Sequence, residues 1–142
     1  MNYIFSMSIN KIVCYLYTSF DQKKKLIDFI SHYRKYKSGL NHKLIICLKL
    51  LNTEEIFKTR KYLKNIKYTE FIDPNKTNDW DFGSYKRVAK YYYDKEILFL
   101  NSHSYPICNN WLKKLFLYKN KNTVIAPTAS YESLVDSIKL KN

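Results

Sequence analysis

Residues 11–50 read KIVCYLYTSFDQKKKLIDFISHYRKYKSGLNHKLIICLKL, and this stretch decides the fold. It begins with KIVCYLY and ends with HKLIICLKL, two short runs of β-branched, aromatic and aliphatic residues that are typical of buried strands. Between them, apolar residues recur at helical spacing up to about Lys37, and Asp21 is the candidate N-cap. The stretch therefore predicts a strand–helix–strand unit with parallel strands.

The same alternation continues toward the end of the chain. Three more strands are expected at Lys67–Asp73, Glu96–Leu100 and Asn122–Ala126. Further helices are expected from Thr53, from Trp80 to about Tyr92, and after Asn109 or Asn110. This order predicts an α/β fold, a mainly parallel sheet of about five strands with helices on both faces, in the manner of a nucleotide-binding half-domain.

Length and composition bound the architecture and its location. The 142 residues, 46% of them hydrophobic, suit a single domain over 1–142 and exclude intrinsic disorder of the whole chain. We expect residues 1–8 to be a disordered extension and residues 134–142 a tail. No apolar run approaches the roughly 20 residues of a membrane span. Three distant cysteines without metal-ligand spacing suggest a reducing compartment, so we expect a cytoplasmic protein, free or peripheral to the inner face of the membrane.

The net charge of +13 has two readings. It suits a basic α/β binding module for nucleic acid or an anionic surface. However, Lys outnumbers Arg 22 to 3, and Lys, Asn, Ile and Tyr make up 63 of the 142 residues. Coding DNA of low GC content produces that pattern whatever the function, and phosphate readers often favour Arg. Nucleic acid is therefore the less favoured partner.

Functional groups are expected beyond the carboxyl ends of the strands, near the switch in strand order. After the first strand, Tyr17, Thr18 and Ser19 are candidates for contact with a nucleotide, although the loop lacks the glycine-rich motifs of dinucleotide and P-loop proteins. Thr18 and Ser19 would otherwise simply cap the next helix. Asp73 either contacts the base or ribose of a nucleotide or opens a turn before Pro74.

Two further segments carry candidate residues. In DFGSYKR, residues 81–87, a glycine lies near a helix N-terminus, where backbone N–H groups favour an anion. Lys86 and Arg87 would then face a diphosphate, and Asp81 and Gly83 are further candidates for binding the nucleotide sugar. The alternative is an ordinary helix start with a solvated basic turn. In NSHSYP, residues 101–106, polar side chains follow an apolar strand abruptly. The candidates there are Asn101, Ser102 and His103, and the alternative is a polar turn.

Residues 81–115, DFGSYKRVAKYYYDKEILFLNSHSYPICNNWLKKL, resemble part of a family-2-like glycosyltransferase with the GT-A fold. In that family a glycine-containing helix leads into a hydrophobic strand that ends in a D-x-D motif, and a W-L-x-x-L helix follows. Here Ile97–Leu100 is similar to the strand and Trp111–Leu115 to the helix, while NTVIAPTASYES, residues 122–133, is similar to the next strand and loop. The resemblance covers roughly residues 11–133.

The resemblance implies transfer of a sugar from a nucleoside diphosphate to a cell-surface glycan or lipid-linked acceptor. The residues 101–103, Asn-Ser-His, stand where the family has D-x-D, whose carboxylates hold a divalent cation. Three readings stay open: His103 helps to hold Mn²⁺ or Mg²⁺, the site works without metal through Lys86 and Arg87, or it is inactive.

The chain is shorter than the family's catalytic domains. It is similar to their nucleotide-binding half alone, and it offers no residue that can be assigned as the catalytic base. An incomplete sheet would also leave an exposed end, so a homodimer or a partner chain is expected.

Overall fold

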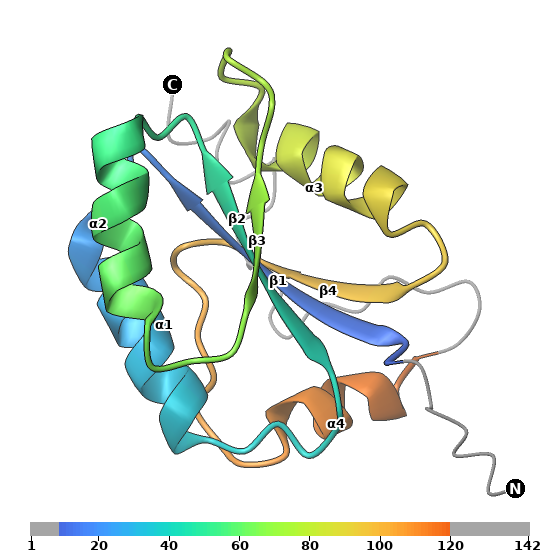
Figure 1. Ribbon diagram of the computed structural model, residues 1–142. Helices are drawn as coiled ribbons and strands as arrows, with labels where there is room; N and C mark the ends of the chain where they lie inside the picture. The colour runs from blue at the N-terminus through green and yellow to red at the C-terminus, as the bar shows by residue number, and fades with distance from the viewer. Residues whose placement is uncertain (1–8, 120–142) are drawn as a thin grey trace, which may run out of the picture.

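The computed structural model describes residues 9–119 (Figure 1). Its elements, in chain order, are β1 (Lys11–Thr18), α1 (Lys23–Lys35), β2 (Lys43–Lys49), α2 (Thr53–Leu63), β3 (Thr69–Ile72), α3 (Trp80–Tyr91), β4 (Glu96–Leu100) and α4 (Trp111–Leu117). This order confirms the strand–helix alternation expected from the sequence. No helix in the described part is long and apolar enough to cross a membrane.

The four strands form one parallel sheet in the order β3-β2-β1-β4. Lys11 of β1 pairs with Glu96 of β4, and Ile45 of β2 pairs with Thr69 of β3. The α/β fold with a parallel sheet is confirmed, with four strands where about five were expected. The fifth expected strand, Asn122–Ala126, lies outside the described residues, as do the extension 1–8 and the tail 134–142.

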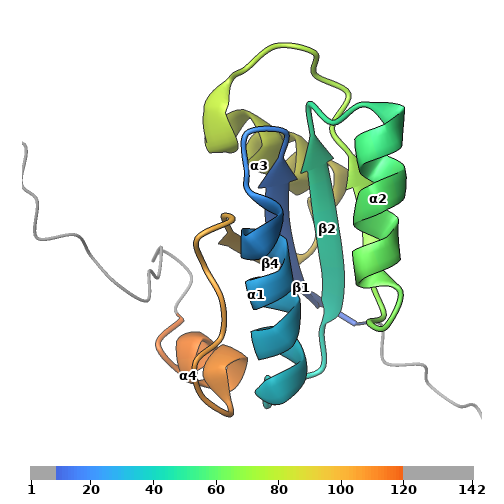
Figure 2. The same ribbon diagram turned by 90° about the vertical axis from the view of Figure 1, so that its left-hand side faces the viewer.

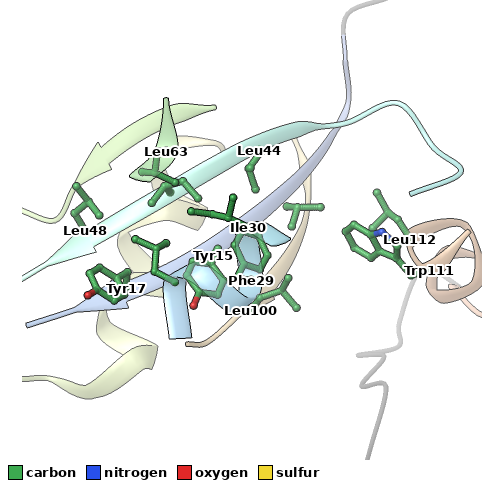
Figure 3. Packing of buried hydrophobic residues seen from close by; sticks show 13 residues of the cluster. Tyr15, Tyr17, Phe29, Ile30, Leu44, Leu48, Leu63, Leu100, Trp111 and Leu112 are labelled. Carbon is green, nitrogen blue, oxygen red and sulfur yellow. The ribbon is translucent and has the colours of Figure 1, made fainter. Parts of the chain in front are cut away.

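The pleat of β1 separates two cores. Val13, Tyr15 and Tyr17 face α1, α2 and α4, whereas Ile12 and its neighbours on the other face pack against α3. Figures 1 and 2 show α1 and α2 on one side of the sheet and α3 on the other. In the larger core, the rings of Tyr15 and Phe29 are stacked at 3.9 Å (Figure 3). Helices therefore cover both faces, as predicted.

The helix starts are built in three different ways. At α2, the side chain of Asn52 accepts from the backbone N–H of Glu55, whose carboxylate accepts from the N–H of Asn52, which is a capping box. At α4, the N–H groups of Leu112 and Lys113 donate to the carbonyl of Ser38, both at 3.1 Å. At α1, the N-cap is Gln22, and it makes no side-chain cap hydrogen bond.

The prediction that Asp21 caps α1 was therefore wrong. The Asp21 carboxylate accepts instead from the backbone N–H and the hydroxyl of Thr18, both at 2.8 Å, and from Ser102 Oγ at 2.5 Å. The bond to Ser102 joins the end of β1 to the loop after β4. Asp21 therefore stabilises the carboxyl end of the sheet instead of the start of α1.

Candidate functional site

A hollow of about 300 Å³ lies at the carboxyl ends of β1 and β4. In the sheet, β2 pairs with one edge of β1 and β4 pairs with the other. The hollow therefore lies at the point where the strand order switches from one side of β1 to the other. In Figure 2 the arrowheads of β1 and β2 point upward, toward this end of the sheet. The hollow is lined by Leu16, Thr18, Phe20, Asp21, Lys49, Asn78, Trp80, Asp81, Asn101, Ser102 and His103.

One wall of the hollow is the loop after β4. The side-chain oxygen of Asn101 accepts from the backbone N–H of His103 at 3.1 Å and from Ser104 Oγ at 2.9 Å, so it closes the turn internally. Ser102 is buried; its carbonyl accepts from Tyr15 Oη at 3.3 Å and its hydroxyl donates to Asp21. His103 is exposed on the hollow. The segment is thus a polar turn and also lines the hollow.

Beneath the hollow, two carboxylates and two cations form a compact network. Arg87 donates from Nε and Nη2 to the two oxygens of Asp73, both at 2.6 Å, and from Nη1 to Asp79 at 2.6 Å. The ammonium of Lys49 donates to Asp79 Oδ1 at 2.5 Å. Ser84 Oγ donates to Asp73 at 2.5 Å. Because the two cations match the two carboxylates, the network is neutral.

The network lowers the pKa of both aspartates and raises the pKa of Arg87. Hydrogen bonds from Arg87 and Lys49 hold the pKa of Asp79 well below its usual range. Burial alone would raise the pKa of Asp73, but hydrogen bonds from Arg87, Ser84 and the N–H of Asn75 outweigh it and lower that pKa. The same carboxylates raise the pKa of Arg87. Both aspartates are therefore ionised at neutral pH.

Gly83 lies against this network and leaves no open anion cradle. A Cβ built on Gly83 would overlap the carboxylate of Asp79. The space that a glycine leaves near the start of α3 is therefore filled by the protein's own carboxylate. Arg87 is likewise engaged by Asp73 and Asp79, and Lys86 is exposed without lining the hollow.

Trp80 has an unusual backbone and an exposed ring. Its φ is 59°, which is uncommon for an aromatic residue, and 77% of its surface is exposed. Its carbonyl accepts from the ammonium of Lys49, and its N–H donates to Asn78 Oδ1 at 3.1 Å. Phe20, 71% exposed, lies at the same hollow. Two aromatic rings are thus held at the rim, one on a strained backbone of the kind that often marks functional sites.

The sequence candidates therefore divide into four groups. Thr18, Asp81, Asn101, Ser102 and His103 meet at the hollow. Tyr17 and Ser19 line a smaller neighbouring hollow of about 140 Å³ beside α2. Asp73, Gly83 and Arg87 belong to the supporting layer, and Lys86 belongs to neither.

The sequence predicted the strand ends 17–21 and 73–78, which contain Phe20 and Asn78, but named neither residue, and it missed Lys49 and Trp80. Lys49 is the most instructive of these, because only 1% of its surface is exposed. A lysine at the end of an otherwise apolar strand is costly to bury without an anionic partner. The run HKLIICLKL therefore contained a signal for a buried ion pair, although it does not name Asp79.

Among the described residues, no group of three or more His, Cys, Asp or Glu side chains is arranged to hold a metal ion. Asp81 and His103 are the side chains at the hollow that remain to bind a metal ion, since Asp21 is held by Thr18 and Ser102.

Comparison of the chain with family models, curated proteins and solved structures finds no match.

Proposed function

We propose that this chain is a glycosyltransferase-like protein that binds a nucleoside-diphosphate sugar in the hollow between β1 and β4. The reaction proposed is transfer of the sugar to a cell-surface glycan or lipid-linked acceptor. One observation carries the binding site: loops after β1, β3 and β4 converge at the switch point of a parallel sheet. The resemblance of residues 81–115 to family-2-like glycosyltransferases supplies the reaction class.

The lining of the hollow suits flat rings that carry hydroxyl groups. Phe20 and Trp80 offer exposed aromatic faces for a base or for the C–H face of a sugar. Asp81 accepts hydrogen bonds from hydroxyls, and Asn78 can both donate and accept. A few polar groups among apolar walls are the usual make-up of a small-molecule site.

The charged side chains of the hollow determine how a diphosphate could bind there. Lys49 is matched by Asp79, whereas Asp21 and Asp81 add two carboxylates. A diphosphate would be repelled there unless a cation accompanied it. We propose that Asp81 and His103 would hold Mn²⁺ or Mg²⁺ together with the phosphates. The cation would supply charge neutralisation there.

On this proposal the described residues supply the donor side. The resemblance inferred from the sequence is to the nucleotide-binding half of the family, and we propose that a partner chain or a second copy supplies the acceptor side. The supporting network of Asp73, Asp79, Arg87 and Lys49 would hold the start of α3, which carries Trp80 and Asp81, in place.

The test is thermal unfolding against a panel of nucleoside diphosphates and nucleotide sugars, with and without Mn²⁺. A ligand of the native state at a hundredfold excess over its Kd stabilises by about 2.7 kcal/mol and raises Tm. We expect Trp80→Ala and Asp81→Asn to abolish most of that shift, and Asp94→Asn, an exposed aspartate paired with Lys95, to leave it unchanged. A folded wild-type chain that no nucleotide stabilises would overturn the proposal, as would an undiminished shift in both site variants.

A further inference from the structure

The amino-terminal edge of the sheet carries a lysine at the start of every described strand. Lys11 and Lys43 are the first residues of β1 and β2, Lys95 directly precedes β4, and Lys67 lies two residues before β3. We call these four residues the lysine edge. Because all four strands are parallel, their starts share one edge of the sheet. Strands about 4.8 Å apart make this a row roughly 14 Å wide.

One hollow on this edge is cationic. It measures about 600 Å³ and is lined by Lys43, Lys67 and Lys95, with Tyr68, Tyr92 and Ile9 among the other side chains. None of the described residues that line it is acidic. Three lysines, at or just before the starts of three strands, therefore surround a concave surface to which no described carboxylate contributes.

The nearby carboxylates do not balance the ammonium groups. Lys95 pairs with Asp94 at 2.8 Å, and Lys11 lies 3.4 Å from Glu96, which also binds Lys119. Lys43 lies 5.7 Å from the centre of the Tyr92 ring. Within residues 9–119, neither Lys43 nor Lys67 forms an ion pair. Five ammonium groups thus face two carboxylates.

Exposed apolar side chains lie beside these charges. Ile9 lines the cationic hollow and is 42% exposed. Leu117, 70% exposed, lines a second hollow of about 480 Å³ together with Lys11, Lys113 and Lys119. Lysine stems, tyrosine rings and single aliphatic side chains are the groups that occupy the boundary between water and lipid.

We propose that the lysine edge docks on an anionic membrane surface through lipid headgroups. Flexible lysines neutralise a diffuse layer of negative charge without reading its geometry. Two of the three arginines, Arg60 and Arg87, whose planar forks would suit nucleic-acid phosphates, are held by carboxylates elsewhere. The lysine composition and the apolar flank favour lipid over nucleic acid.

This docking fixes an orientation and does not rest on the proposed function. The hollow at the switch point lies at the opposite end of β1, which has eight residues and therefore spans about 26 Å. With the lysine edge on the membrane, that hollow opens toward water.

The experiment is co-sedimentation of the full chain with vesicles of phosphatidylcholine, alone or with about 30% phosphatidylglycerol to give an anionic surface. The test variant is Lys43→Gln/Lys67→Gln/Lys95→Gln. The control variant, Lys58→Gln/Lys61→Gln/Lys76→Gln, loses the same charge from α2 and from the loop after β3. Each lysine near an anionic surface contributes roughly fivefold, so the test variant should bind the anionic vesicles on the order of 100-fold more weakly.

We expect the control variant to bind within about threefold of wild type, and added salt to weaken binding by screening. Circular dichroism and thermal melting establish that both variants are folded. Equal losses of binding affinity in the test and control variants would contradict the proposal, as would equal binding of the wild-type chain to neutral and anionic vesicles. So would absence of binding to anionic vesicles, or a single-stranded oligonucleotide that binds more tightly and depends on the same three lysines.

Discussion

Asp79 is held in place by two cationic side chains. It accepts from Arg87 and Lys49 and lies in the space left by the missing side chain of Gly83. Alanine normally favours a helix by about 1 kcal/mol over glycine. Here that preference conflicts with a carboxylate that two cations hold in place. The glycine is therefore explained by a close approach between side chain and backbone.

A double-mutant cycle at Gly83 and Asp79 should show that the effect of Gly83→Ala on stability depends on the Asp79 carboxylate. In the wild-type background, Gly83→Ala should destabilise the protein by about 1–3 kcal/mol, because the added methyl group displaces the carboxylate. In an Asp79→Ala background the same substitution should be neutral or stabilising by up to about 1 kcal/mol. Urea unfolding of the four proteins measures the coupling. The same effect of Gly83→Ala in both backgrounds would show that Asp79 is not the obstacle.

The buried pair between Asp73 and Arg87 makes a second prediction. The side chain of Asp73 is fully buried, and that of Arg87 is 27% exposed. Asp73→Asn should lower the free energy of unfolding by about 2–3 kcal/mol, because it leaves a partly buried guanidinium without its bidentate partner. Glu70→Gln is the matched control, since it removes a bidentate partner from the exposed Arg60 and should cost less than about 1 kcal/mol. Comparable losses from the two substitutions would contradict this difference.

At the scale of the elements, α1 and α2 begin differently although they pack against the same face. The capping box of Asn52 and Glu55 satisfies N–H groups of α2, and Glu54 and Glu55 favour its positive end. α1 has no acidic residue in its first turn and begins with three lysines. Its stability therefore comes from the burial of Leu26, Phe29 and Ile30.

Substitutions at the two N-caps should have opposite effects. Asn52→Ala should destabilise by about 1 kcal/mol, because an N–H of α2 loses its acceptor. Gln22→Asp should stabilise by up to about 1 kcal/mol, because Gln22 is exposed, has an extended backbone and precedes the three lysines of α1. Thermal melting of the two single variants tests this, and a destabilised Gln22→Asp would show that the carboxylate of Asp21 repels it.

The helices and strands could be predicted from the sequence more easily than the contacts of the candidate site. The apolar runs of β1, β2 and β4 and the helical spacing between them carry local signals, so order and sheet type followed from them. The role of Asp21 did not, because its partner Ser102 lies 81 residues away. The pairing of Lys49 with Asp79 likewise spans a crossover. The loop candidates follow the carboxyl ends of the strands, but which of them line the hollow depends on contacts that the local sequence does not show.

At the scale of the whole molecule, ionisable groups limit stability at both ends of the pH range. The lowered pKa values of Asp73, Asp79 and Glu96 mean that their stabilisation is present above about pH 4 and is lost as pH falls toward those values. Burial raises the pKa of Tyr33 to about 12 and also raises the pKa of Tyr15 and Tyr85. Their stabilisation is complete below about pH 10 and is lost as pH rises through the raised values.

We therefore expect the midpoint of urea unfolding to be nearly constant from about pH 5 to pH 9 and to fall on both sides. In Asp73→Asn the decline on the acid side should be shallower, because one carboxylate with a lowered pKa is gone. The share of tyrosinate absorbance that comes from Tyr15, Tyr33 and Tyr85 should rise with the alkaline unfolding transition instead of near pH 10. An acid limb identical to that of wild type in the Asp73→Asn variant would exclude this carboxylate as a cause.

The strand order also has a consequence for the time course of synthesis. β1 is made first among the strands, yet one of its two edges pairs with β4, which follows about 80 residues later. At about 5–20 residues per second, a ribosome needs roughly 4–16 seconds to cover that distance. Throughout that interval the apolar strand KIVCYLYT can pair with β2 but still has an open edge. A nascent chain of this protein is therefore most exposed to aggregation and most dependent on chaperones just before β4 leaves the ribosome.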